Sequence, residues 1–156
     1  MRAGPGLLAK NASRGAAFGD LFNTGLQDVV VNNMNDSPTL LHNCASPLGH
    51  SLVVQLAGTR SNRSAIGARV TVSVAGRRLI DEVRSGGSFC SQSDLRIHVG
   101  LGAQKRADRI EVAWPSGAAE TITGVDADQL VVIREGSGVV RRTPLVRRAL
   151  TGCPAH

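Results

Sequence analysis

Short runs of alternating apolar and polar residues, separated by turn residues, constrain the fold of this chain more than any other feature. In residues 68–74, valines alternate with Arg, Thr and Ser, the period-two pattern of a half-buried strand. The Ala75-Gly76 turn predicts a hairpin with residues 77–83. Similar runs occupy residues 51–57, 95–101, 109–114, 119–123 and 129–135. The pattern predicts an all-β module, either an antiparallel sandwich or barrel-like.

The polar stretch before this first strand is predicted to be a structured loop. Ser61, Asn62 and Ser64 carry side chains that bond to nearby backbone, and Gly67 is expected to supply a positive φ. The loop also holds a candidate binding set of Asn62, Arg63 and Arg69, because a guanidinium fork suits carboxylate ligands. The alternative is structural: Asn62 holds the loop, and the two arginines pair across strands with Asp81, Glu82 or Asp94.

Residues 14–44 have a different organisation from the strands that follow. Asp20 and Asp28 flank a turn at Gly25, and the apolar run Val29–Val31 and the short strand 39–42 come next. This segment resembles one FG-GAP/VCBS repeat of a β-propeller, a family with an acidic calcium loop. The resemblance places calcium ligands at Asp20, Asn23, Thr24 and Asp28.

The calcium loop is degenerate. Its third position is Phe22, which has no oxygen, and its fifth is the neutral Thr24. Because ligand charge sets calcium affinity, we expect little or no calcium binding, and no other cofactor. In the alternative reading, Asp20 and Asp28 serve as turn and cap residues.

Five sequence blocks in one order carry a second resemblance. They are Ser61-Asn62-Arg63 with residues 65–70, Glu82 with residues 85–88, Ser91-Gln92, residues 97–102 and residues 112–117. Together they resemble the ASPIC/UnbV domain, which is found behind FG-GAP repeats in bacterial secreted proteins and in relatives of animal cartilage acidic protein. Phe89-Cys90 departs from the pattern, which often has Tyr there.

The second resemblance implies an extracellular or periplasmic location and an adhesion or scaffold role, with no catalytic residues to transfer. The implied partners are upstream propeller repeats and an unknown protein, extracellular-matrix or cell-surface ligand. The N-terminus does not read as a secretory signal, and no apolar run is long enough to span a membrane. A truncated gene product of little independent function is therefore the alternative.

The chain is expected to divide into four parts: a lead-in at 1–13, the repeat remnant at 14–44, the β domain at 50–135 and a disordered basic tail at 136–156. The formal net charge is +6, but four of the 18 basic residues lie in the tail, which has no acidic residue. The rest of the chain holds 14 basic and 12 acidic residues, so its net charge is small. No nucleic-acid partner is expected, because a basic stripe and stacking aromatics are both lacking.

An enzyme is the rival from another class. Its candidate residues are Cys90 as nucleophile and His98 as base, but neither sits in a catalytic motif. We therefore expect no catalysis. The spacing of Cys44, Cys90 and Cys153 matches no metal motif, and a Cys44–Cys90 disulfide stays open as an alternative.

Overall fold

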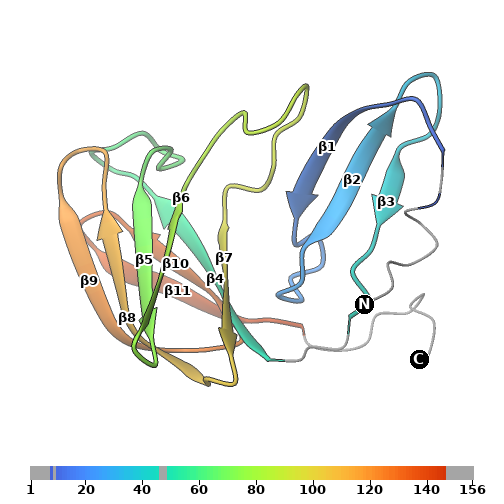
Figure 1. Cartoon of the computed structure of the whole chain (residues 1–156). Coiled ribbons are helices and arrows are strands. Elements are labelled where there is room, and N and C mark those ends of the chain that lie inside the picture. Colours follow the sequence, from blue (N-terminus) through green and yellow to red (C-terminus); the bar gives the residue numbers. More distant parts are fainter. Residues whose placement is uncertain (1–7, 9, 46–48, 147–156) are drawn as a thin grey trace.

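The computed structural model describes residue 8 and residues 10–45 and 49–146, and every statement about structure below concerns these residues (Figure 1). Their regular structure consists of strands in three sheets, none of which closes into a barrel. The all-β prediction is confirmed, and the barrel alternative is wrong. Within the described part, no helix has the length and apolar character needed to cross a membrane.

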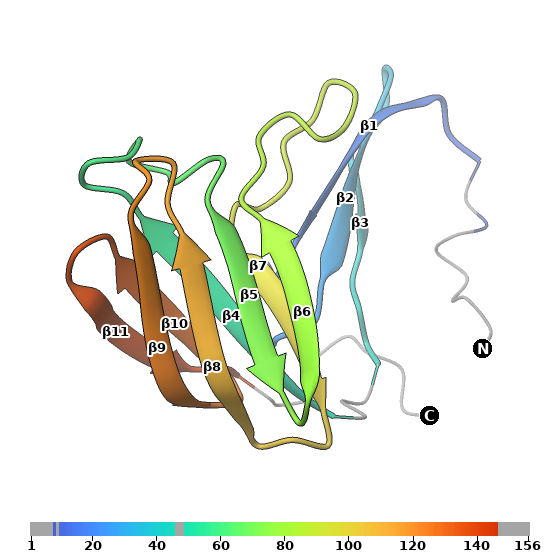
Figure 2. The same cartoon turned by 60° about the vertical axis from the view of Figure 1, so that its left-hand side comes forward.

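Two four-stranded sheets form a sandwich. The front sheet has the order β6-β5-β8-β9 and is antiparallel throughout (Figure 2). Its strands are β5 (Arg69–Val74), β6 (Arg77–Glu82), β8 (Arg106–Ala113) and β9 (Ala119–Asp126). The hairpin predicted at Ala75-Gly76 is confirmed, since β5 pairs with β6 from Arg69↔Glu82 to Val74↔Arg77.

The back sheet has the order β11-β10-β4-β7. Its strands are β4 (His50–Ala57), β7 (Ile97–Gly102), β10 (Gln129–Arg134) and β11 (Gly138–Pro144). β4 and β10 are parallel, so the prediction of a purely antiparallel module is wrong at this pair. Parallel pairing needs a long connection, and here the whole front sheet lies in the sequence between the two strands.

One hydrophobic core fills the space between the two sheets. The alternating valines of β5 contribute Val70, Val72 and Val74, each no more than 1% exposed. The back sheet contributes Leu52, Val54, Val131 and Ile133 to the same cluster. Trp114, at the end of β8, is also buried there. With so few aromatic residues, the sandwich is held mainly by branched aliphatic side chains.

The prediction of a disordered tail is wrong for residues 138–144, which form β11. β11 pairs with β10 from Arg134↔Gly138 to Gln129↔Pro144. Its arginines and its final proline are tolerated because β11 is an edge strand with one side free of partners. The rest of the predicted tail, residues 147–156, lies outside the described residues.

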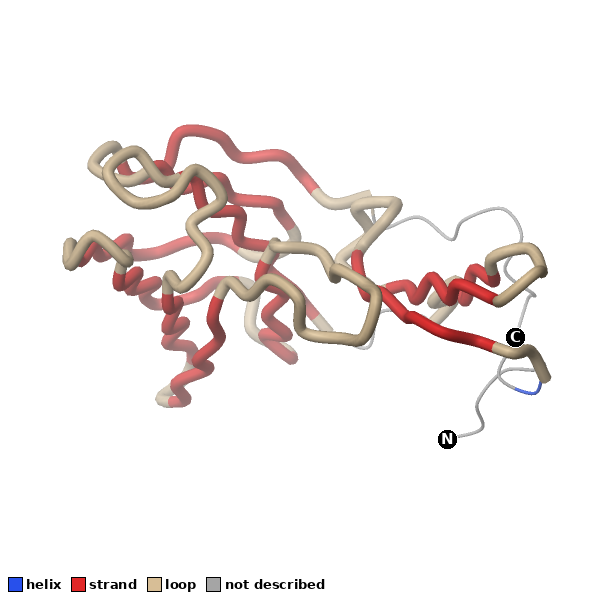
Figure 3. The backbone as a smooth tube through the Cα atoms, turned by 90° about the horizontal axis from the view of Figure 1, so that it is seen from above, coloured by secondary structure: helices blue, strands red, loops and turns tan. Residues whose placement is uncertain are grey.

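A separate N-terminal sheet stands beside the sandwich (Figures 1 and 3). Its order is β1-β2-β3, with β1 (Ser13–Gly19), β2 (Asp28–Asn33) and β3 (Thr39–Leu41). The sequence predicted a strand at 39–42 and an apolar run in β2 but not β1, where Gly and Ala weaken the strand signal. β1 lies nearest the sandwich and its long β6–β7 loop (Figure 1).

Gly67 has the positive φ predicted for it, at +90°. Its N–H donates to the carbonyl of Val83, so the turn is tied to the end of the β5–β6 hairpin. A Cβ built at Gly67 would meet only the Cγ of Pro115, at the ordinary distance of 3.6 Å. The cost of a side chain there is therefore backbone strain and not a clash.

We predict that Gly67→Val lowers the free energy of unfolding by about 1–3 kcal/mol, the usual cost of a strained backbone conformation. Urea denaturation measures this loss. Gly87→Val is the control, because Gly87 has open space around it and no positive φ. Equal stability of the two variants would show that φ at Gly67 carries no strain.

Candidate functional site

A buried carboxylate fixes the first half of the loop between β4 and β5. Glu135 follows β10 and is 3% exposed. Its Oε2 accepts the N–H groups of Thr59, Arg60 and Ser61, each at 2.8 Å. Its Oε1 accepts the hydroxyls of Ser61 at 3.0 Å and Ser116 at 2.5 Å. Five donors on one carboxylate hold this loop to the end of β10 and to the turn after Trp114.

These bonds set the protonation behaviour of Glu135. Burial alone would raise the pKa of its carboxyl, because a charge is costly away from water. The hydroxyl of Ser116 and the N–H groups of Ser61, Thr59 and Arg60 outweigh this, and lower the pKa from 4.5 to about 2. The loop is therefore held by an ionised group at every pH near neutrality.

The second half of the loop closes on Asn62. Its side-chain amide donates to the carbonyl of Ile66 at 2.8 Å, and its Oδ1 accepts the N–H of Ile66 at 2.9 Å. The backbone N–H of Gly58 donates to the carbonyl of Arg63 at 3.1 Å. Asn62 is thus occupied inside the loop, in the structural role that the sequence offered as one of two alternatives.

The cross-strand ion pairs expected for Arg63 and Arg69 are wrong. Both side chains are exposed, and neither makes an ion pair within the described part of the chain. Two of the three carboxylates named as their partners pair with other arginines: Asp81 lies 3.8 Å from Arg84, and Asp94 lies 2.6 Å from Arg96. Of the candidate binding set, Arg63 and Arg69 therefore keep unpaired guanidinium groups.

Arg63 borders a cleft of about 590 Å³ at the end of β4, which we call the Arg63 cleft. It is lined by Gln55, Leu56, Ala57, Arg63, Ser64, Asp94, Leu95 and Arg96. This volume lies within the usual range for small-ligand sites. Arg69 does not line the cleft, so the structure separates it from Arg63.

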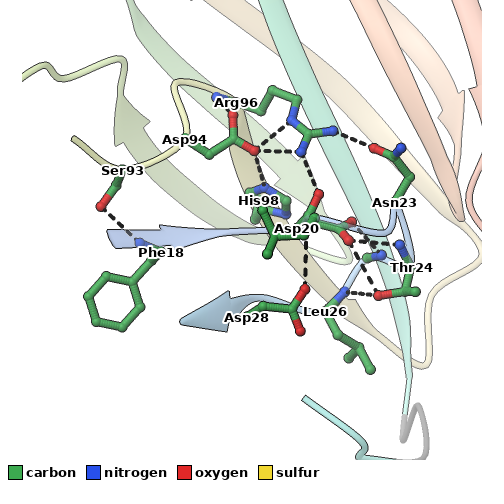
Figure 4. A network of polar contacts seen from close by, with 12 residues as sticks. Phe18, Asp20, Asn23, Thr24, Leu26, Asp28, Ser93, Asp94, Arg96 and His98 are labelled. Atoms are coloured by element: carbon green, nitrogen blue, oxygen red, sulfur yellow. Dashed lines mark hydrogen bonds and ion pairs between the residues drawn. The ribbon is translucent and has the colours of Figure 1, made fainter. Parts of the chain in front are cut away.

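Arg96 joins the sandwich to the N-terminal sheet (Figure 4). Its guanidinium donates to Asp94 at 2.6 Å, to the Oδ1 of Asn23 at 2.6 Å and to the carbonyl of Asp20 at 2.7 Å. Segment 91–94 completes the junction along the free edge of β1. Asp94 N–H donates to the carbonyl of Phe18, and Ser93 Oγ accepts the N–H of Phe18. The edge of β1 is therefore covered, which protects it from unwanted strand pairing.

Asp94 is the anionic centre of this junction. Burial would raise the pKa of its carboxyl, but the neighbouring His98 and Arg96 lower it well below its ordinary value. The Nε2 of His98 lies 3.8 Å from the Oδ2 of Asp94. The charge of Arg96 is therefore balanced by an ionised partner on the same segment.

The four residues of the degenerate calcium loop do lie on one loop, but their oxygens are engaged by the protein. Asp20 accepts the N–H groups of Thr24 at 2.8 Å and Gly25 at 2.7 Å. Asp28 accepts the N–H of Leu21 at 3.2 Å and contacts the ring of His42 at 2.7 Å. Asn23 takes part in the bond to Arg96. In this geometry Asp20 and Asp28 accept backbone N–H groups of the loop, which is the turn and cap role stated as the alternative from the sequence.

The described residues contain no cluster of three or more His, Cys, Asp or Glu side chains arranged to hold a metal ion. Cys90 lies exposed on the β6–β7 loop as a free thiol, and no described bond connects it with His98. Cys44 is disulfide-bonded, so the alternative of a Cys44–Cys90 bridge is wrong. Cys153 lies outside the described residues.

Sequence reasoning missed Glu135 and Arg96. The loop residues that Glu135 holds are at least 74 positions away in the sequence, and the contacts of Arg96 with Asp20 and Asn23 span 76 and 73 positions. No local pattern marks such bonds. The polar loop at 59–61 signals that its backbone needs partners, but not where they come from.

A family model described as ASPIC and UnbV matches residues 58–140. The match begins at the loop held by Glu135 and ends within β11. Among proteins with curated descriptions, no sequence matches this chain.

We predict that Glu135→Gln destabilises the protein at neutral pH and flattens its acid unfolding curve. The folded-state pKa of Glu135 is lowered, so its stabilisation is full above about pH 4.5 and is lost as the pH falls toward about 2. Denaturant unfolding between pH 2 and 7 measures the difference. Glu82→Gln, at an exposed carboxylate without a side-chain bond in the described part, is the control. If the free energy of unfolding of Glu135→Gln fell between pH 4.5 and 2 as steeply as that of the parent chain, Glu135 would not be the group responsible.

We also predict that Arg96→Gln loosens the N-terminal sheet and leaves the sandwich folded. Loss of charge-assisted bonds should speed amide exchange at residues 20–28 by about tenfold to a hundredfold, while β5 and β8 keep their protection. Hydrogen exchange measured by NMR resolves the two regions, with Arg69→Gln as the matched control. Equal exchange rates at residues 20–28 in the two variants would show that Arg96 does not hold the N-terminal sheet to the sandwich.

Proposed function

The chain belongs to the ASPIC and UnbV family, and from this premise we propose that it is a non-catalytic interaction and scaffold module. The molecular function of the family is poorly defined, so the proposal rests on the surfaces of this molecule. The observation that carries it is the apolar and exposed character of the N-terminal sheet.

Both faces of the N-terminal sheet present apolar side chains. Phe18, Val29 and Leu41 are directly opposite one another in the β1-β2-β3 register and therefore share one face. Val30 and Leu40 share the other face. Phe18 is 47% exposed and Leu40 is 49% exposed. A three-stranded sheet with two apolar faces is suited to packing between other sheets.

The attachment of this sheet to the sandwich leaves its faces available. The junction uses the edge of β1 and the loop between β1 and β2, through Ser93, Asp94 and Arg96 (Figure 4). Stacked repeats bury such faces against their neighbours, and several repeats are needed for a stable array. We propose that further sheets of the FG-GAP/VCBS type occupy these faces, and that the sandwich is fixed beside them.

The family resemblance also supports an extracytoplasmic setting and a protein or cell-surface ligand. In this scheme the bonds made by Asp20 and Asp28 hold the β1–β2 loop in shape without requiring calcium. The sandwich is then the part that meets the ligand, and the N-terminal sheet is the part that meets the scaffold.

We predict that the chain binds a purified FG-GAP repeat protein that lacks its last repeat, with a negative heat-capacity change because apolar faces are buried. Isothermal titration calorimetry measures the binding. Phe18→Lys and Leu40→Lys, one on each face, should weaken it by about tenfold or more, as each places a charge in an apolar contact.

Ile80→Lys is the matched control, because Ile80 is 61% exposed on β6 of the front sheet and is not part of the N-terminal sheet. Circular dichroism confirms that each variant is folded. Absence of binding, or equal loss in all three variants, would contradict the proposal.

A further inference from the structure

The hydrogen-bonded ladder between β4 and β7 stops before β4 ends. The last pair on this side is Val54↔Ile97, whereas β4 continues to Ala57 and stays paired with β10 as far as Arg134. In the same register the next residue pair would be Gln55 with Arg96, and the next hydrogen-bonded pair would be Leu56 with Leu95; neither pair forms. The last residues of β4 therefore have a partner strand on one side only.

The peptide groups of Leu56 point toward the unpaired side. The carbonyl of Ala57 accepts the N–H of Glu135, on the β10 side of the strand. Successive residues of a strand direct their N–H and C=O groups to opposite sides, so those of Leu56 face away from β10. No hydrogen bond to them from this side occurs among the described residues.

This unpaired edge forms part of the wall of the Arg63 cleft. Three polar side chains in the wall, those of Gln55, Arg63 and Ser64, make no hydrogen bond within the described part of the chain. Backbone donors and acceptors next to free side-chain donors are the features that an extended chain recognises.

The charges in the cleft favour an anion. Arg96 is balanced by Asp94 at 2.6 Å, whereas Arg63 has no acidic partner among the described residues. The loop that carries Arg63 is held by Glu135 and Asn62, so its guanidinium is presented from a fixed backbone. A carboxylate is the natural ligand for this planar donor group.

We propose that the Arg63 cleft binds a short extended peptide segment that carries a carboxylate. The segment pairs with the N–H and C=O of Leu56 as an added strand in line with β7, and its carboxylate bonds to Arg63. The carboxylate is that of the segment's C-terminus. This inference names the ligand class for the sandwich and rests on the proposed interaction role.

The probe is acetyl-Thr-Val-Thr with a free carboxylate, chosen because β-branched residues favour an extended backbone. In a two-dimensional NMR titration of the full chain, amide signals of Leu56, Ala57, Arg63 and Ser64 should shift and saturate. Arg63→Gln should weaken binding by about tenfold to a hundredfold, the effect expected for a lost charge-assisted bond. The C-terminal amide of the same peptide should bind more weakly to a similar degree.

Arg69→Gln is the matched control and should bind as the parent chain does. Absence of saturable shifts, or equal affinity in Arg63→Gln and Arg69→Gln, would overturn the proposal. Equal affinity for acetate would also overturn it, because the Leu56 edge would then play no part.

Phe18→Lys separates this proposal from the scaffold role. It should lose the repeat-protein contact and keep peptide binding, since Phe18 does not line the Arg63 cleft. Loss of peptide binding in folded Phe18→Lys would contradict the assignment of the peptide to this cleft.

Discussion

The bonds between Glu135 and the backbone of residues 59–61 are the constraint on which the rest of the sandwich site depends. One buried carboxylate supplies acceptors for three consecutive N–H groups that would otherwise lack partners. It also accepts the hydroxyl of Ser116, so the loop, the end of β10 and the turn after Trp114 meet at one point. Arg63 lies two residues after Ser61, so these bonds help to fix the position of its backbone.

The second organising interaction is the guanidinium of Arg96. It binds Asp94 on its own segment and two groups of the β1–β2 loop, so one side chain spans the sandwich and the N-terminal sheet. The junction uses an edge and a loop, which leaves the apolar faces of the N-terminal sheet available to other sheets. The architecture therefore separates a scaffold-facing part from a ligand-facing part.

Alternation along the chain, together with the Ala75-Gly76 turn, was enough to predict every strand of the sandwich except β11, because these strands contribute side chains to a common core. Gly67 was predictable because its turn demands a positive φ, and the structure has it. The parallel β4–β10 pair, the β11 edge strand and the roles of Glu135 and Arg96 were not. They depend on contacts between distant residues, and the basic composition of β11 resembles that of a solvated tail.

Amide hydrogen exchange of Thr59, Arg60 and Ser61 in the unmodified chain tests the central claim most directly, since a loop of this kind normally exchanges fast. If Glu135 fixes the loop, these three amides exchange as slowly as those of β4 and β10, and they lose that protection below about pH 2, where Glu135 takes up its proton. Exchange at the rate of the exposed residues 85–89, at any pH, would contradict the account.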